Sequence, residues 1–524
     1  MIFMPKNNYE QNLEDLTESG DLFYYQGKPA EGVFRDYYPT GELWHEAPYA
    51  QGAKDGLAKT FRRNGAVSDE IPYKRGKQEG IHKKYHRNGL LKTEISYVNG
   101  EKDETEKHYY ENGALELEAH YEQGALEGTA KTWYESGALH TEVPWAQGVR
   151  EGTAKEFYEN GGLKEEVSWK QGKQEGWERR YFTGGVLRFE VPYSQDYAEG
   201  MVRQYYENGH LFVQTPYKRD EKDGIAITYY DNGQLQTETP YIKGKKDGVE
   251  KDYNLDGQLC RETTYKQDEL DGTIKSWYKD GRLESEGTYK AGKRHGTFKC
   301  YSEKGQLKEE TSFKNGERDG IERIYHYYTN FTLSSETSYK EGVLDGIARN
   351  YFDNGNMEKE CTYKQGKLDG LYKRYYSNGS LYEEINYTHG KNDAVCKGYH
   401  DNGQLKYERI YKDGMLNGME KWYRDNGELE SEVNYTGDKM DGVYRRYYTG
   451  GLLYEEVPYT QGMKDGMEKV YYDNGRLKSL TPYTKGMING VEKIYHEDGR
   501  LLSETSYKMG KKCFSIKNLF RRRG

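Results

Sequence analysis

A glycine recurs at a fixed interval of about 24 residues along almost the whole chain, and this period constrains the fold more than any other feature. The series runs from Gly41 to Gly305 and, after one irregular stretch, from Gly355 to Gly499. Self-similarity at a fixed period of this size indicates a repeat protein, in which small units stack in a line and contact their neighbours. We therefore expect function to lie on a long surface rather than in a separate catalytic domain.

The composition agrees with a thin array that has much surface. A chain of 524 residues could hold several ordinary domains, but the sustained period predicts one array with few internal boundaries. The apolar fraction is only 34%, while 54 tyrosines raise the aromatic share to 14%. Amphipathic rings are therefore expected to supply much of the packing.

Each period has the signature of a β-hairpin. In the unit that starts at Gly41, the pattern predicts a strand over residues 43–49, a turn through Gly52 and Gly56, and a second strand that ends near Phe61. Runs that alternate between apolar and polar residues and are bounded by glycine-containing turns are typical of hairpins, because glycine and asparagine tolerate positive φ. No helical stripe of useful length interrupts the array.

Alternation along the first strand assigns residues to two faces of a sheet. We expect Leu43, Ala47 and Tyr49 to share the buried or half-buried face, and Glu46 to lie on the opposite one. A glutamate recurs at this position in nearly every unit. Eight of the 11 prolines stand two residues later, as Pro48 does. Because proline has no N–H to donate to a neighbouring strand, this position predicts a bulge or a strong twist in the strand.

A basic residue recurs three positions after the second turn glycine, as Lys59 follows Gly56, and this spacing predicts a ladder of ion pairs. If the turn that contains Gly65 has two residues, Lys59 lies directly opposite Glu70. A three-residue turn with a bulge would shift the pairing by one residue, and the sequence leaves both registers open. Each exposed pair contributes about 0.2–1 kcal/mol, so we expect the ladder to fix register and solubility more than stability.

Tyr49 and its equivalents form a first aromatic row, and a second row stands two residues after the basic position, as in Phe61 and Tyr85. Equivalent residues of successive units lie two strands apart, about 9.5 Å, which exceeds the roughly 4.5–7 Å of ring contacts. The rings are expected to pack against the leucine or tyrosine of the strand between them. We interpret the two aromatic rows as structural filling, with an exposed binding surface as the alternative.

Charge and targeting signals exclude several classes of protein. The formal net charge is −9 with both signs interleaved, which argues against binding nucleic acid. The segment 1–20 lacks a basic stretch followed by an apolar run, and no apolar stretch is long enough to cross a bilayer, so a cytoplasmic location is expected. Five cysteines at unrelated repeat positions predict reduced thiols: Cys260, Cys300, Cys361, Cys396 and Cys513.

Signatures of catalysis are missing from the sequence. It contains no nucleophile elbow, phosphate-binding loop, dinucleotide fingerprint or zinc-protease motif, and the 12 histidines have no ligand spacing. Repeated glutamate and lysine imitate acid–base pairs, but a pattern present in every unit indicates architecture. We expect no enzyme activity, no cofactor and no metal site.

The unit resembles the MORN repeat, and more closely the variant found in many bacterial proteins. Residues 231–253 carry the pattern nearly in full, from Asn232 and Gly233 through Glu238 to Tyr253. The resemblance covers about residues 24–510, roughly 20 units. It implies an all-β fold, in which roughly 20 tandem hairpins, each of about 24 residues, form one elongated, twisted antiparallel sheet.

The resemblance leaves two functions open. MORN arrays generally act as scaffolds that bind proteins or associate with membranes, which implies a non-enzymatic scaffold for a protein partner, with membrane contact as an addition. The bacterial variant is often described as an antitoxin component of toxin–antitoxin pairs, which implies that the partner is a toxin. Rescue of cells from a toxin encoded beside this chain would favour the second function.

The ends and one irregular unit depart from the repeat. Residues 1–20 precede the array of residues 21–510, and we expect a short capping helix over residues 12–19. Residues 326–332 carry two extra residues, which indicates a tolerated loop insertion or a bend. The tail of residues 511–524 is a basic amphipathic segment that predicts contact with an anionic membrane or a partner, or else a soluble tail. Its candidate contact residues are Lys511, Lys512, Phe514, Lys517, Leu519, Phe520, Arg521, Arg522 and Arg523.

Overall fold

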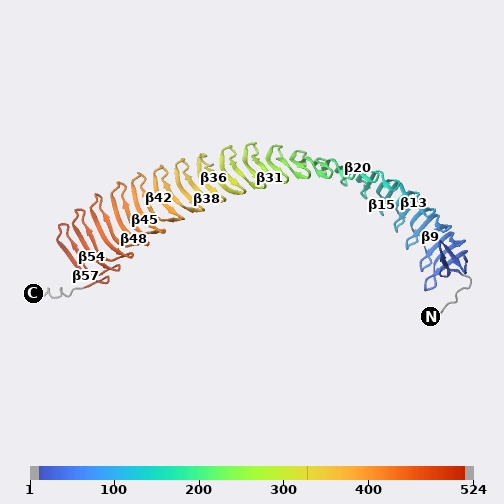
Figure 1. Ribbon diagram of the computed structural model, residues 1–524, viewed down its shortest axis with the longest axis horizontal. Coiled ribbons are helices and arrows are strands. Elements are labelled where there is room, and N and C mark those ends of the chain that lie inside the picture. The colour runs from blue at the N-terminus through green and yellow to red at the C-terminus, as the bar shows by residue number, and fades with distance from the viewer. Residues whose placement is uncertain (1–10, 327, 514–524) are drawn as a thin grey trace. The chain divides into compact units, whose positions relative to one another are not determined.

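The computed structural model describes residues 11–326 and 328–513, and these residues form β-strands almost throughout. Within them the one helical element is a 3-10 helix, η1 (Leu13–Asp15). The chain divides into two compact units, residues 1–259 with 265–268 and residues 260–264 with 269–524. In each unit the hairpins follow one another in chain order and join edge to edge in a long antiparallel sheet, which confirms the predicted fold class (Figure 1).

Every period begins with an eight-residue strand. These strands are β6 (Leu43–Ala50), β9 (Val67–Lys74), β12 (Leu91–Val98), β14 (Leu115–Glu122), β16 (Leu139–Ala146), β19 (Leu163–Lys170), β21 (Leu187–Ser194), β24 (Leu211–Lys218), β27 (Leu235–Ile242), β30 (Leu259–Lys266), β32 (Leu283–Lys290), β35 (Leu307–Lys314), β37 (Leu333–Lys340), β39 (Met357–Lys364), β42 (Leu381–Thr388), β45 (Leu405–Lys412), β48 (Leu429–Thr436), β51 (Leu453–Thr460), β54 (Leu477–Thr484) and β57 (Leu501–Lys508).

The return strand runs unbroken in some hairpins and is split in two in others. Unbroken return strands are β13 (Glu101–Tyr109), β15 (Ala125–Trp133), β20 (Lys173–Tyr181), β31 (Glu269–Trp277), β36 (Glu317–Tyr325) and β38 (Val343–Tyr351). Split ones are β7 (Ala53–Lys54) and β8 (Gly56–Phe61), β10 (Lys77–Gln78) and β11 (Gly80–Tyr85), β17 (Val149–Arg150) and β18 (Gly152–Phe157), β22 (Tyr197–Ala198) and β23 (Gly200–Tyr205), β25 (Glu221–Lys222) and β26 (Gly224–Tyr229), β28 (Lys245–Lys246) and β29 (Gly248–Tyr253), β33 (Lys293–Arg294) and β34 (Gly296–Tyr301), β40 (Lys367–Leu368) and β41 (Gly370–Tyr375), β43 (Lys391–Asn392) and β44 (Val395–Tyr399), β46 (Met415–Leu416) and β47 (Gly418–Tyr423), β49 (Lys439–Met440) and β50 (Gly442–Tyr447), β52 (Met463–Lys464) and β53 (Gly466–Tyr471), and β55 (Met487–Ile488) and β56 (Gly490–Tyr495), while β58 (Lys511–Lys512) follows β57.

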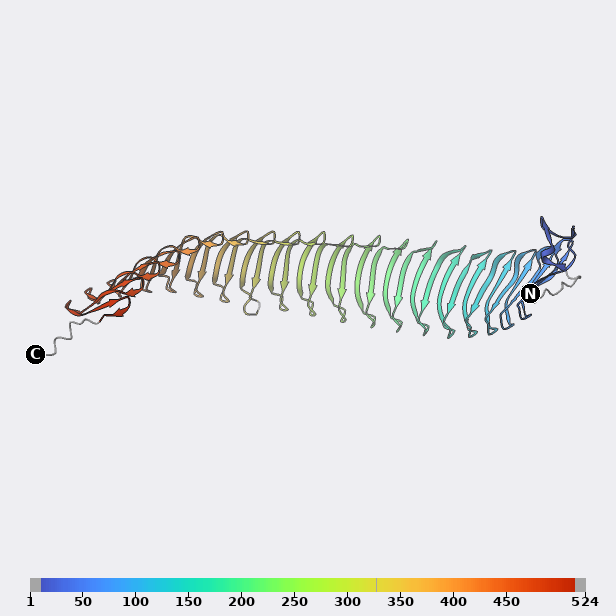
Figure 2. The same cartoon turned by 90° about the horizontal axis from the view of Figure 1, so that it is seen from below.

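Two kinds of turn lie along opposite edges of the sheet in each unit (Figure 2). At one edge, Ala50 pairs with Ala53, so the loop has two residues, Gln51 and Gly52, with φ of 53° and 81°. Two successive positive φ values define the type I′ turn, whose twist matches that of the flanking strands. The sequence predicted that Gly56 belongs to this turn. That prediction was wrong, because Gly56 begins strand β8.

Gly56 forms the bulge that the prolines predicted. Its φ is +117°, and the Cβ of any larger residue would lie 2.8 Å from Cγ of Pro48 on the neighbouring strand. The Pro48 carbonyl accepts a hydrogen bond from the N–H of Asp55, which closes the ladder beside the bulge. Glycine is required at this position because both the backbone conformation and the Pro48 ring exclude a Cβ atom.

The other turn has three residues and still gives the predicted ion-pair register. The N–H of Arg62 bonds to the carbonyl of Ala66, which leaves residues 63–65 in the loop. A bulge at Ser68 then restores the alignment, so Lys59 lies directly opposite Glu70. Sequence reasoning treated a three-residue turn and direct pairing as alternatives. The structure has both because the second bulge cancels the shift.

This bulge also corrects the assignment of faces. Tyr37 pairs with Leu43, and Arg35 pairs with Glu46. Since Arg35 and Tyr37 stand two residues apart on one strand, Leu43 shares the face of Glu46 rather than that of Tyr49. We call the side of Glu46 and its equivalents the charged face, and the side of Tyr49 and its equivalents the aromatic face.

Hydrogen bonds from side chains tie each hairpin to the next. The Tyr134 hydroxyl donates to the carbonyl of Phe157 in the following hairpin at 2.8 Å, and the Tyr230 hydroxyl donates to the carbonyl of Tyr253 at 2.8 Å. Where another residue replaces this tyrosine, the bond persists: a guanidinium nitrogen of Arg62 donates to the Tyr85 carbonyl at 2.5 Å. These bonds fix neighbouring hairpins in a thin sheet that has little buried volume.

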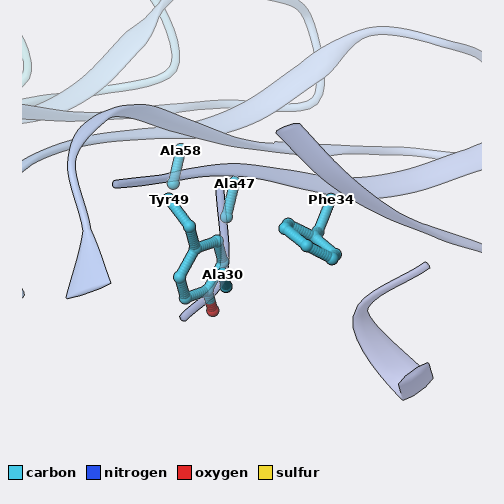
Figure 3. Close-up of a cluster of buried hydrophobic side chains, with 5 residues drawn as sticks. All are labelled: Ala30, Phe34, Ala47, Tyr49 and Ala58. Atoms are coloured by element: carbon cyan, nitrogen blue, oxygen red, sulfur yellow. The ribbon is translucent and has the colours of Figure 1, made fainter. Parts of the chain in front are cut away.

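The first hairpins enclose the largest buried cluster that the described residues form. Ala30, Phe34, Ala47, Tyr49 and Ala58 are nearly or completely buried (Figure 3). The elements β1 (Gln11–Asn12), η1, β2 (Thr17–Ser19), β3 (Leu22–Tyr25), β4 (Lys28–Pro29) and β5 (Gly32–Tyr37) surround this cluster, with β1 parallel to β5 and β2, β3 and β4 in a small separate sheet. The helix expected over residues 12–19 is therefore limited to the three residues of η1 and is followed by a strand.

The irregular unit keeps the register of its strands. Arg323 of β36 still lies opposite Glu336 of β37, and the N–H of His326 bonds to the carbonyl of Thr332 across the enlarged turn. The two extra residues therefore lie in the turn, as expected for a tolerated loop insertion.

Candidate interaction surfaces

The charged face carries the predicted ladder of alternating charges. Glutamates of the eight-residue strands lie opposite basic residues of the return strands, and in places one basic residue bridges two glutamates. Arg323 contacts Glu310 at 2.6 Å and Glu336 at 2.8 Å. Arg349 contacts the same Glu336 at 3.0 Å and Glu360 at 2.7 Å. The ladder is interrupted where Gln214 lies opposite Ile227 and where Leu480 lies between Lys469 and Lys493.

The second aromatic row lies on this charged face and reinforces the ladder. The Tyr85 hydroxyl donates to a carboxylate oxygen of Glu70 at 2.8 Å, and Lys59 lies 3.1 Å from the same carboxylate. Burial alone would raise the pKa of Glu70, but the hydrogen bonds from Tyr85 and Lys59 outweigh it, and this pKa lies below its ordinary value. Burial and the Glu70 carboxylate raise the pKa of Tyr85 to about 12.

Replacing Tyr85 by phenylalanine is expected to raise the pKa of Glu70. In the native protein the lowered pKa means that ionised Glu70 contributes stability above its unfolded pKa, and this stability is lost as pH falls through the folded pKa. Without the Tyr85 hydroxyl, the loss begins at a higher pH. Carboxyl-carbon NMR titration of Glu70 in both proteins measures the change, and an unchanged Glu70 pKa would contradict it.

A row of exposed apolar side chains runs beside the ladder on the charged face. Members follow the bulge glycine, as Leu57 follows Gly56, except Val395, which follows Ala394. Leu57 pairs with Pro72 while Lys59, two residues on, pairs with Glu70. We call this the apolar row. Its exposed members are Val33, Leu57, Ile81, Ile225, Val249, Ile321, Ile347, Leu371, Val395, Met419, Met467 and Val491.

The aromatic face is built from the first aromatic row and the short strands between its rings. Cations stand between the rings of this first row in many hairpins, whereas leucine or tyrosine was predicted between the rings of the second row. Lys54 lies 5.2 Å from the ring centre of Tyr73, and Lys222 lies 4.8 Å from that of Tyr241. The prediction holds for the second row, in which Tyr85 pairs with Leu91. Cation–π contacts explain how tyrosines remain half-buried on a sheet with no covering layer.

A cavity of about 330 Å³ opens on the aromatic face within the first unit. It lies where tryptophan replaces tyrosine in two successive hairpins, at Trp145 and Trp169. Arg150 lies over both rings, 5.6 Å from the centre of Trp145 and 4.7 Å from that of Trp169. Arg150, Ala154 and Trp169 are among the residues that line the cavity.

Sequence reasoning named the tail as the candidate contact site, and the structure describes only its start. Lys511 and Lys512 form the exposed strand β58, paired with Lys508 and Tyr507. Phe514, Lys517, Leu519, Phe520, Arg521, Arg522 and Arg523 lie outside the described residues. Sequence reasoning did not identify the apolar row and the cavity, although the aliphatic residue after the second glycine and the paired tryptophans are visible in the sequence.

Residues 11–326 and 328–513 hold no cluster of three or more histidine, cysteine, aspartate or glutamate side chains suited to a metal ion. Among the same residues, no helix has the length and apolar character needed to cross a membrane.

Comparison with known proteins identifies the repeat. A family profile described as "MORN repeat variant" matches residues 30–51, 78–99, 105–123, 126–147, 150–171, 198–219, 222–243, 246–267, 270–291, 294–315, 344–365, 368–389, 392–413, 416–436, 464–485 and 488–509. No curated protein matches the chain.

The solved structures that match this chain do not extend the identification of the repeat. The crystal structure of TcdB2-TccC3-Cdc42 matches at 13% identity over 92% of this chain and 28% of that chain, with a TM-score of 0.13. The Tc holotoxin pore of Photorhabdus luminescens matches at 13% identity over 94% of this chain and 28% of that chain, with a TM-score of 0.13. This chain spans less than a third of those chains, and similarity at this TM-score carries no argument about fold or function.

Proposed function

This chain belongs to the MORN repeat variant family, and from that premise we propose that it is a non-enzymatic scaffold that binds a protein partner along its charged face. The observation that carries the proposal is the apolar row. One aliphatic side chain at 37–54% exposure stands at the same repeat position in the successive hairpins from Ile321 to Met419 and in several others, while threonine takes this position at Thr105, Thr129, Thr153, Thr273 and Thr297. Contiguous apolar side chains bordered by polar ones are typical of protein-binding surfaces.

The ladder suits the rim of such a surface. Its glutamates are paired with lysines and arginines on both neighbouring strands, as Glu336 is with Arg323 and Arg349. Paired side chains are held in place, so a partner meets a fixed pattern of charge beside the apolar row. Charge of this kind contributes mainly to specificity and association rate, whereas the apolar contacts contribute affinity.

Substitution within the apolar row tests the proposal. In the second unit, Ile321, Ile347 and Leu371 are 38%, 41% and 45% exposed, so serine at all three positions is expected to leave the fold intact. The full chain and this triple variant are used as baits in extracts of the native cell, and bound proteins are quantified by mass spectrometry. We expect a partner captured by the native chain to fall at least tenfold with the triple variant.

A matched control removes equal apolar area away from the row. Val343, Met415 and Met463 are 46%, 46% and 47% exposed and stand beside the two-residue turns. Serine at these three positions is expected to leave capture within twofold of the native level. Equal loss in both triple variants, or no loss in either, would contradict binding along the apolar row.

The remaining expectations stay predictions. Residues 514–524 lie outside the described residues, so contact of the tail with an anionic membrane is tested by vesicle binding with and without residues 511–524. The antitoxin role and the cytoplasmic location likewise rest on the sequence.

A further inference from the structure

Some cations on the aromatic face are neutralised by a glutamate of the same return strand. In four hairpins a lysine or arginine of the short strand contacts a glutamate four residues later. These pairs are Lys102–Glu106 at 2.6 Å, Lys246–Glu250 at 2.5 Å, Arg318–Glu322 at 3.3 Å and Lys464–Glu468 at 2.5 Å. The carboxylate in each of these pairs is largely buried, and the cation also contacts a ring of the aromatic row.

Arg150 occupies the same position but lacks this carboxylate. The residue four places later is Ala154, which pairs with Val167 just as Glu106 pairs with Ala119. Arg150 forms no ion pair with any of the described residues. Lys54 and Lys222 stand four residues before alanines, and Arg294 stands four residues before Phe298 and lies over the Phe298 and Phe313 rings, but of these cations it is Arg150 that lines the cavity.

The carboxylates around the cavity already have partners. Glu165 and Glu178 contact Arg180 at 2.7 Å and 2.8 Å, and Glu156 contacts Lys164 at 2.7 Å. Arg150 therefore forms no ion pair with the carboxylates that line this cavity. Guanidinium groups bind carboxylates through parallel N–H donors, and this interaction strengthens where water is partly excluded.

A second donor at the cavity also lacks an acceptor. The indole Nε1–H of Trp169 is buried and makes no hydrogen bond to the described residues. Trp169 lines the cavity and contacts Arg150 through its ring. A buried N–H without an acceptor is costly, so this group favours a ligand oxygen.

We propose that this cavity binds a carboxylate group, which takes the place that a glutamate side chain fills beside the equivalent cations of other hairpins. Arg150 supplies the positive charge, Val143, Val167 and the Trp169 ring supply apolar walls, and the Trp169 indole N–H supplies a further donor. A free organic acid and an acidic side chain of a partner chain present the same group. The inference does not depend on binding along the charged face, because the cavity opens on the opposite face.

The indole N–H signal of Trp169 in the full-length protein reports on this site. We titrate sodium acetate, the tripeptide acetyl-Gly-Glu-Gly-amide and its neutral counterpart acetyl-Gly-Gln-Gly-amide, and follow this signal in nitrogen–proton NMR spectra; Trp169→Phe assigns it. Acetate and the glutamate peptide are expected to shift the signal saturably, and the glutamine peptide is expected to bind at least tenfold more weakly. Tighter binding of the glutamate peptide than of acetate indicates a partner chain as the source, and equal binding indicates a free acid.

Two single substitutions separate this proposal from a general charge effect. Ala154→Glu supplies the internal carboxylate seen at Glu106 and Glu250, so acetate binding is expected to fall at least tenfold while the fold is kept. Thr153→Glu adds the same charge on the charged face and is expected to leave binding within twofold. Acetate binding that survives Ala154→Glu, or a shift equal for both peptides, would overturn the proposal.

Discussion

Replacing Phe34 by alanine is expected to lower the free energy of unfolding of the first hairpins by about 3–5 kcal/mol. Phe34 is fully buried, and its ring contacts those of Tyr25 and Tyr49 edge-on, with centres 5.4 Å and 5.5 Å apart. Few other side chains in this thin sheet are so enclosed. Because hairpins contact mainly their neighbours, the loss is expected to be local, and amide hydrogen exchange over β5 to β8 measures it.

The neighbouring residue provides the control. Val33 is 40% exposed and lies on the opposite face of the same strand, so Val33→Ala is expected to cost less than about 1 kcal/mol. A similar loss of protection in both variants would show that the buried cluster does not stabilise the start of the array.

Replacing Gly224 by alanine is expected to destabilise its hairpin by about 2–4 kcal/mol. Its φ is +121°, a conformation that strains any residue with a Cβ, and that Cβ would lie 2.7 Å from Cγ of Pro216. Strain and steric contact therefore add at this site. Denaturant unfolding together with hydrogen exchange over β24 to β27 measures the effect.

Gly233 of the same hairpin is the matched control. It also has positive φ, +85°, but the nearest atom to an added Cβ lies 3.9 Å away, so Gly233→Ala is expected to cost only about 1–2 kcal/mol. Adding Pro216→Ala to Gly224→Ala should recover the part of the loss that comes from the ring. If the two glycine variants are equally stable, the bulge does not require glycine at Gly224.

The sequence predicted the hairpins, the ladder and the bulge because each depends on residue types at fixed spacing. Proline marks a strand position that needs no N–H, and Pro48 lies against the bulge that it predicted. Glutamate and lysine at fixed offsets predicted the pairing of Lys59 with Glu70 for a two-residue turn, and the structure has this pairing with a three-residue turn. These signals are strong because the same residue types recur at the same positions of successive units.

The faces could not be assigned from alternation alone. One extra residue at Ser68 reverses the alternation within a strand, so Leu43 and its equivalents lie on the charged face. A bulge of this kind has no signature residue, because any side chain can occupy it. The apolar row and the cavity depend on which face each residue meets, and sequence reasoning therefore missed both.

Deletion of one whole period tests the central claim most directly, namely that each period of the sequence forms one interchangeable hairpin. Removing residues 209–232 takes out Gln214 and Ile227, which interrupt the ladder, and brings Arg203 opposite Glu238. We expect hydrogen-exchange protection over β21, β23, β27 and β29 to match that of the native protein, whereas removal of residues 209–220 alone should abolish it, because the strand that follows would then run in the wrong direction. Equal protection in the two deletion variants, or loss of protection in both, would contradict the account.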